Sequence, residues 1–224
     1  MSFPVTSDGE SAVQRTAPRV TAAQLCAGAV TLFAVLVALL HVIEPEFGPT
    51  WRFVSEYSNG AYGWIMRLAF FTMAVGCAAA IAAIRPHAHT KPGVVGLFFL
   101  AITVVGLVMA GLFNQDSITS NVATREGNLH AIASMLGIPG FVLASLLLGL
   151  SLARRWPSLR TRLIVLSTAP LITFVSMPLY MAIAMPGAGG FDPAVWVGLI
   201  NRLFLVAMCG WLLFVASHAE RVRP

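Results

Sequence analysis

The fold is decided by uncharged stretches such as residues 94–113, VVGLFFLAITVVGLVMAGLF, in which 20 consecutive residues carry no ionisable side chain. A helix of about 20 residues crosses a hydrocarbon core of roughly 30 Å, so this stretch has the length of one membrane span. Of the 224 residues, 58% are hydrophobic and 10% are charged, whereas soluble domains carry about 25% charged residues. The composition therefore predicts an all-α integral membrane protein.

Six segments bounded by charge, proline or glycine share this character. They are predicted over Leu25–Ile43, Gly63–Ile84, Val94–Phe113, Asn128–Leu152, Leu163–Ala184 and Ala194–Ser217. We therefore expect a six-helix transmembrane domain over residues 21–219, a disordered tail over residues 1–20 and a short tail over residues 220–224. The first apolar run starts late for a signal peptide, so it is expected to be a retained span.

Small residues indicate where helices approach one another closely. Gly106 and Ala110 in the third span, and Gly140 and Ala144 in the fourth, are pairs four residues apart. Such pairs remove side-chain bulk from one helix face and allow a neighbouring helix to pack against it. We expect both spans to have a close-packed face.

Lysine and arginine are concentrated in the loops of one side. That side holds Arg15, Arg19, Arg85, Lys91, Arg154, Arg155, Arg160, Arg162, Arg221 and Arg223, while the opposite loops hold Arg52 and Arg125 with most of the carboxylates. Because short cytoplasmic loops are rich in lysine and arginine, both termini are predicted to lie in the cytoplasm and the protein in the plasma (inner) membrane. The cations form no patch of the kind that binds nucleic acid, so no nucleic-acid partner is expected.

The connection after the first span carries an unusual group of polar residues. Residues 51–67 read WRFVSEYSNGAYGWIMR, with Ser55 and Glu56 in a short polar island and Arg67 already inside the second span. Arg202 lies similarly inside the sixth span. Since charge within a bilayer is costly, both arginines are candidate functional residues.

Further polar residues are expected at the same level, on the predicted outer side. His41 closes the first span, Asp116 follows the third, and His130 opens the fourth with Ser134 and Gly137 on its face; Tyr180 and Asn201 lie in the fifth and sixth. We therefore expect an outer-facing polar cavity with the 51–67 connection as one wall. The acid–base candidates are Glu56, Asp116 and His130, and the ligand-binding candidates are Ser55, Arg67, Tyr180, Asn201 and Arg202.

Three interpretations of this cluster remain open. The acid–base candidates, with His41, are residue types that bind Zn²⁺ for hydrolysis, but no motif fixes their spacing and no metal ligand is assigned. Alternatively, the arginines bind a polar or anionic lipid-like headgroup, with membrane lipids as the partners. In the third interpretation, Arg67 and Arg202 neutralise Glu56 and Asp116 in a structural network, as in a non-catalytic scaffold or small transporter. We take headgroup binding as the leading hypothesis; the sequence identifies no cofactor and no protein partner.

Four motifs also resemble a known family. They are SEYSNGAYGW (55–64), GLFNQD (111–116), NLHAIASMLGIPG (128–140) and GLINRLFLVAMCGWLL (198–213). They are similar to the hallmarks of the six-span prokaryotic membrane proteins catalogued as domain of unknown function nine-nine-eight, over about residues 25–217. The resemblance implies the same fold and topology and singles out Ser55, Glu56, Gly63, Trp64, Asp116, His130, Asn201 and Arg202.

The chain departs from the family pattern in places. It has Asn201 where glutamine is expected and Asn-Gln where Pro-Thr is expected before Asp116. His41 and Arg67 have no counterpart in the pattern. The resemblance implies no activity, because none is assigned to the family.

Overall fold

The structure is a computed structural model that describes residues 20–188 and 190–221. Its long helices are α1 (Ala22–Ile43), α2 (Gly63–Ile84), α3 (Lys91–Leu112), α4 (Arg125–Arg155), α5 (Arg160–Ala188) and α6 (Val197–Arg221). The short 3₁₀ helices η1 (Val54–Asn59), η2 (Arg85–His87) and η3 (Pro157–Leu159) lie in the connections, and no strand occurs within the described ranges. Each long helix is long and apolar enough to cross a membrane, which confirms the all-α fold with six spans.

Helices α1, α3 and α4 begin before the predicted apolar spans because polar caps start them early. Thr21, Thr90 and Thr124 precede α1, α3 and α4, and each hydroxyl accepts a hydrogen bond from the backbone amide three residues later. Such caps satisfy amides that have no partner within the helix. The predicted tail over residues 1–20 falls almost wholly outside the described residues, and the tail over 220–224 is described only as far as Arg221, where α6 ends.

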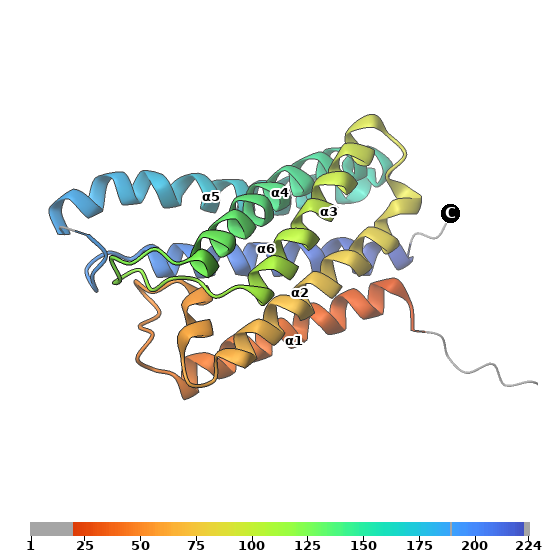
Figure 1. Ribbon diagram of the computed structural model, residues 1–224. Coiled ribbons are helices and arrows are strands. Elements are labelled where there is room, and N and C mark those ends of the chain that lie inside the picture. Colours follow the sequence, from red (N-terminus) through yellow and green to blue (C-terminus); the bar gives the residue numbers. More distant parts are fainter. Residues whose placement is uncertain (1–19, 189, 222–224) are drawn as a thin grey trace, which may run out of the picture.

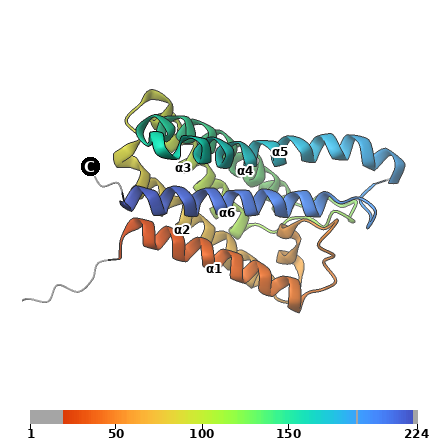
Figure 2. The same cartoon turned by 180° about the vertical axis from the view of Figure 1, so that it is seen from behind.

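The six helices lie side by side in a bundle (Figures 1 and 2), and the contacts between them close a ring in chain order. Each helix contacts the next, α6 also contacts α1, and α2 contacts α6 across the ring. The backbones of α3 and α4 approach each other closely, since a Cβ atom on Gly106 would lie 2.6 Å from the amide nitrogen of Gly137. A Cβ atom on Gly140 would lie 3.1 Å from the Thr103 hydroxyl. The predicted close-packed faces of the third and fourth spans are therefore confirmed.

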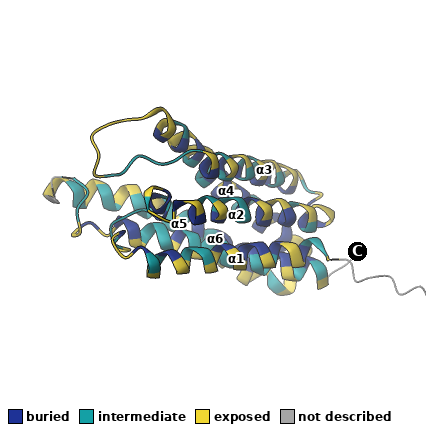
Figure 3. Cartoon of the chain, turned by 60° about the horizontal axis from the view of Figure 1, so that its bottom comes forward, coloured by how far each residue is buried: buried dark blue, intermediate teal, exposed yellow. Residues whose placement is uncertain are grey.

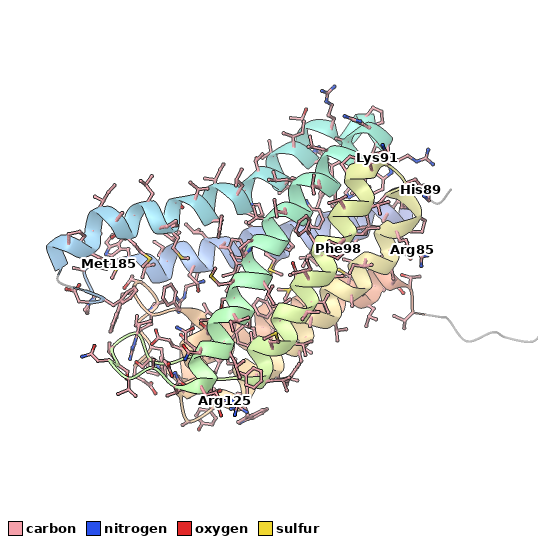
Figure 4. All side chains as sticks on the ribbon, turned by 45° about the horizontal axis from the view of Figure 1, so that its top comes forward. Arg85, His89, Lys91, Phe98, Arg125 and Met185 are labelled. Atoms are coloured by element: carbon pink, nitrogen blue, oxygen red, sulfur yellow. The ribbon has the colours of Figure 1, made fainter. Side chains whose placement is uncertain are left out.

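The two ends of the ring differ in character. The start of α1, the end of α2 and the end of α6 meet at what we call the terminal end, where Nε2 of His87 donates to the Ala219 carbonyl at 3.1 Å. Figure 4 shows Arg85 and Lys91 at this end and Arg125 at the opposite one. The opposite, loop end carries the connections 44–62, 113–124 and 190–196. The orientation of these ends in the membrane remains a prediction from the lysine and arginine pattern.

Buried residues line the inside of the ring, and exposed residues cover its outside (Figure 3). Many exposed residues are large and apolar, such as Phe98, Ile172 and Val206, each more than 60% exposed. Soluble monomers rarely expose apolar surface on this scale. The outer surface therefore suits lipid, as expected for a multi-pass membrane protein.

Candidate functional site

A pair of adjoining cavities extends from the loop end to the centre of the ring. Its outer part, the vestibule, has a volume of about 380 Å³ and is lined by Phe53, Ser55, Gln115, Asp116, Gly127, Asn128, His130, Ala131, Ser134, Ile138, Met177 and Asn201. Its inner part has a volume of about 90 Å³ and is lined mainly by apolar side chains, including Met66, Met73, Phe204 and Met208. Ser55, His130, Ser134, Ile138 and Asn201 line both parts. The vestibule and the inner cavity are therefore adjacent, with these five residues at their boundary.

His130 lies where the two parts of the cavity meet. Its side chain is only 2% exposed, and Nδ1 donates to the carbonyl of Phe113 at 2.9 Å, which fixes the orientation of the ring. Ser134 and Gly137 follow on the same helical face, and all three residues line the inner cavity. The face predicted from their spacing is confirmed.

Ser55 and Asn201 connect η1 to the elements around it. The Asn201 side-chain oxygen accepts from the Val54 amide at 3.1 Å, and the Ser55 hydroxyl donates to the side-chain oxygen of Gln115. These two bonds bring α6, η1 and the 113–124 connection together at the rim of the cavity. The sequence reasoning missed Gln115 because its part in the site depends on how this connection folds back.

Asp116 lies in the 113–124 connection, and its carboxylate is held beside the first turn of α4. Its carboxylate accepts from the Thr124 hydroxyl at 2.7 Å and the Thr124 amide at 2.9 Å. These donors, the hydroxyl first, hold the pKa of the Asp116 carboxyl below its ordinary value. A Cβ atom on Gly127 would lie 2.0 Å from this carboxylate, so only glycine leaves room for it. Among the described residues, Asp116 is the one acidic or basic residue other than His130 that lines the vestibule.

Glu56 is fully buried but lines neither part of the cavity. Its Oε1 atom forms an ion pair with Arg52 at 2.9 Å and accepts from the Ile118 amide at 3.0 Å. Its Oε2 atom accepts from the Phe53 amide at 3.1 Å. The carboxylate therefore joins the 44–62 and 113–124 connections. This geometry supports a structural role for Glu56, and its acid–base role stays a prediction.

Arg52, which the sequence reasoning treated only as a loop cation, is central to this junction. Its guanidinium lies 4.7 Å from the centre of the Trp51 ring and 5.6 Å from that of Phe47. It also donates to the Ser117 hydroxyl at 3.1 Å. The signal that was missed is the four-residue spacing to Glu56, which favours contact wherever the chain is helical.

Arg67 and Tyr180 bind neighbours outside the cavity. Nε and Nη2 of Arg67 donate to the side-chain oxygen of Asn114 at 3.1 Å and 2.8 Å. The Tyr180 hydroxyl accepts from the Trp196 amide at 3.0 Å and so ties α5 to the connection before α6. Neither side chain lines the vestibule or the inner cavity.

Arg202 points toward α1. Its Nε atom donates to Nε2 of His41 at 2.7 Å, and Nη1 donates to the carbonyls of Arg52 at 2.7 Å and Gly198 at 3.1 Å. Nδ1 of His41 donates to the Val37 carbonyl at 2.7 Å. With one ring nitrogen donating and the other accepting, this imidazole is neutral. Arg202 thus fastens the 44–62 connection onto α1 and α6.

The predicted ion-pair network of Arg67 and Arg202 with Glu56 and Asp116 is wrong. The single salt bridge among the described residues joins Arg52 to Glu56. Arg52 reaches Glu56 from one turn away, and Thr124 supplies the donors to Asp116. The two deeper arginines instead bind an amide oxygen, carbonyls and an imidazole.

Nothing in the geometry supports the zinc interpretation. Within residues 20–188 and 190–221, no three His, Cys, Asp or Glu side chains lie close enough together to hold a metal ion. The acid–base candidates are engaged separately, Glu56 by Arg52 and Asp116 by Thr124. We therefore assign no metal ligand.

Comparison with known proteins gives one match. The family model described as "Protein of unknown function (DUF998)" matches residues 26–218, a range that reaches into all six long helices. No curated protein and no solved structure showed a significant match to the chain. The family suggested by the four sequence motifs is confirmed.

Proposed function

The chain is a membrane protein that belongs to the DUF998 family, and we propose that it binds a small amphiphile in its central cavity. The observation that carries the proposal is that a polar vestibule adjoins an apolar inner cavity, with Ser55, His130, Ser134 and Asn201 lining both. Binding sites for small molecules are typically apolar clefts with a few well-placed polar groups. An amphiphile matches this division, with its polar head in the vestibule and its apolar part within the ring.

The vestibule favours a head that forms hydrogen bonds and carries no negative charge. Its lining includes amide, hydroxyl and imidazole groups but neither arginine nor lysine, and Asp116 contributes a carboxylate. An anionic head there would lack a cationic partner and would be repelled by Asp116. We therefore keep a polar headgroup as part of the proposal, without Arg67 and Arg202 as anion contacts, because neither lines this cavity.

The inner cavity limits the apolar part of the ligand. Its volume of about 90 Å³ is smaller than the roughly 150 Å³ apolar cavity that accommodates benzene in an engineered protein. It therefore suits one short apolar segment rather than two acyl chains. On the terminal side of this cavity, Phe141 and Trp211 are fully buried and pack edge to face. That packing favours a binding pocket over a transport passage.

The test compares two neighbouring substitutions on α4. Ser134→Phe places a ring where the vestibule meets the inner cavity, whereas Met135→Phe adds a ring at a side chain that is 75% exposed on the outside of the ring. The purified full-length protein is titrated with a monoacylglycerol and binding is measured by native mass spectrometry. We expect Ser134→Phe to weaken binding by about tenfold or more, the equivalent of about 1.4 kcal/mol. Met135→Phe serves as the matched control and should leave it unchanged.

The head preference is tested with ligands that share one chain. A monoacylglycerol, a fatty amine and a fatty acid of equal chain length differ only in the head, which is hydroxylated, cationic or anionic. We expect the fatty acid to bind the most weakly. Equal binding of all three ligands, or equal binding by the Ser134→Phe and Met135→Phe variants, would contradict the proposal.

A further inference from the structure

A second cavity lies between α1 and α6, on the outside of the ring. This α1–α6 groove has a volume of about 610 Å³ and is lined by apolar residues of the two helices together with His41 and Arg202. Phe33 and Leu205 line both the groove and the inner cavity and so form the wall between them. Val206, another lining residue, is 67% exposed, so the groove opens toward lipid.

Small residues give the groove its shape. Ala34 and Ala38 lie one turn apart on α1, and both are exposed. On α6, a Cβ atom added to Gly210 would meet no atom within 4 Å. Arg202 and Gly210 are separated by eight residues, or about 12 Å along the helix. The groove therefore covers most of one leaflet, whose hydrocarbon is about 15 Å thick, half of the roughly 30 Å core.

The polar end of the groove carries a positive charge without a matching negative one. Among the described residues, Arg202 donates to the neutral imidazole of His41 and to two backbone carbonyls, and it also interacts with the hydroxyl of Tyr57. Its buried Nη2 atom makes no hydrogen bond of ordinary geometry to a described residue. Glu56, the nearby carboxylate, is already paired with Arg52. A guanidinium whose close partners are uncharged favours an anion beside it.

The depth of Arg202 suits the phosphate of a lipid. It lies five residues after the start of α6 at Val197, about 8 Å along the helix. Long basic side chains at this depth reach the headgroup region of a bilayer. The anion most abundant at that level is the phosphate of the lipid itself, and its acyl chain points into the hydrocarbon, as the groove does.

We propose that the α1–α6 groove binds an anionic phospholipid, with the phosphate at Arg202 and an acyl chain against Ala34, Ala38 and Gly210. This site is separate from the central cavity, which has no arginine or lysine in its lining. The two proposed ligands would differ in charge, with one inside the ring and one on its surface. The proposal stands whether or not the central cavity binds an amphiphile.

The test measures phosphatidylglycerol and phosphatidylcholine binding to the purified full-length protein by native mass spectrometry, with the two lipids matched in their acyl chains. The wild type should bind phosphatidylglycerol about tenfold more tightly, as expected for one charge-assisted contact. Gly210→Leu fills the groove without touching Arg202 and should weaken phosphatidylglycerol binding by about tenfold. Arg202→Gln should remove the preference for phosphatidylglycerol over phosphatidylcholine but should leave binding of the acyl chain to the groove.

Gly28→Leu is the matched control for the groove-filling variant. Gly28 is exposed, and as at Gly210 a Cβ atom there would meet no atom within 4 Å, but Gly28 does not line the groove. Equal phosphatidylglycerol binding by the Gly28→Leu and Gly210→Leu variants would overturn the proposal. The proposal would also be overturned if the wild type were a dimer without bound phospholipid and Gly210→Leu dissociated that dimer. A second copy of the protein would then fill the groove. Monoacylglycerol binding in Gly210→Leu separates this site from the central one, because it should remain unchanged.

Discussion

Phe141 and Trp211 fill the ring toward the terminal end, whereas the same helices enclose a cavity toward the loop end. Both side chains are fully buried, and Trp211 also donates to the Ser167 hydroxyl at 2.9 Å. In the loop half, the connections are instead held by hydrogen bonds between them, such as that from the Ile118 amide to Glu56, and by the ion pair of Arg52 with Glu56. Dense packing stabilises the half toward the terminal end, which we call the packed half. The space left in the half toward the loop end, the hollow half, is available for a ligand.

This contrast separates stability from binding along the membrane normal. Substitutions in the packed half should reduce the free energy of unfolding and leave the shape of the cavity intact. Substitutions in the hollow half should act on binding or on how the connections are held. Substitutions in the two halves should therefore differ in how much they change stability and binding.

The largest effect is expected from Trp211→Ala in the packed half. Removing a fully buried tryptophan leaves a void, and such substitutions cost about 3–5 kcal/mol. The measurement is the free energy of unfolding of the purified protein in detergent micelles titrated with a denaturing detergent. Trp64→Ala is the control, because that side chain is 64% exposed and should change stability little. Comparable losses at the two positions would show that the packed half is not where stability resides.

A smaller effect is expected from Glu56→Gln in the hollow half. The substitution leaves Arg52 without its ion pair, and removing one partner of a fully buried pair costs about 3–5 kcal/mol. Because the Arg52 side chain is 17% exposed, we expect a loss of about 2 kcal/mol. The exposed Glu46, changed to glutamine, is the control. Unchanged stability with loss of monoacylglycerol binding would instead place Glu56 in the site.

The next effect concerns the close contact of α3 with α4. A methyl group on Gly106 would lie 2.6–2.7 Å from backbone atoms of Ala133 and Gly137, so Gly106→Ala forces the helices apart and should cost about 1–2 kcal/mol. Gly137→Ala is the matched control, since its nearest neighbour would lie 3.8 Å away. Both free energies of unfolding are measured in the same micelles. A greater loss from Gly137→Ala would mean that the contact is not as tight as the geometry indicates.

Much of this fold follows from the sequence because the membrane simplifies the problem. A backbone in hydrocarbon must satisfy its own hydrogen bonds, so each long apolar run becomes a helix. The predicted spans locate α1 to α6 for this reason, and the small residue at Gly106 marks a real contact. What the runs do not give is their full length, since Thr90 and Thr124 start α3 and α4 before the apolar residues begin.

The site was predicted less completely, because charge partners depend on how the connections fold. Ser55, His130 and Asn201 do line one cavity, as their common level in the spans predicted. Arg202 lies at that level too but faces α1, because the adjacent Asn201 already occupies the face toward η1. The depth of a residue along a helix can be predicted from the sequence. The direction in which its side chain points can be predicted only when the positions of the neighbouring helices are known.

The smallest effect is a pH dependence in the hollow half. The Thr124 hydroxyl and amide lower the pKa of Asp116, so the folded protein binds its proton less readily than the unfolded chain does. The stabilisation is therefore complete above the unfolded pKa of about 3.9 and is lost as the pH falls through the lower, folded pKa. Asp116→Asn should lower the melting temperature relative to wild type near neutral pH, and the two curves should converge in acid. Thr124→Ser keeps both donors and should follow the wild-type curve, whereas parallel wild-type and Asp116→Asn curves would mean that Asp116 is not stabilised by its hydrogen bonds.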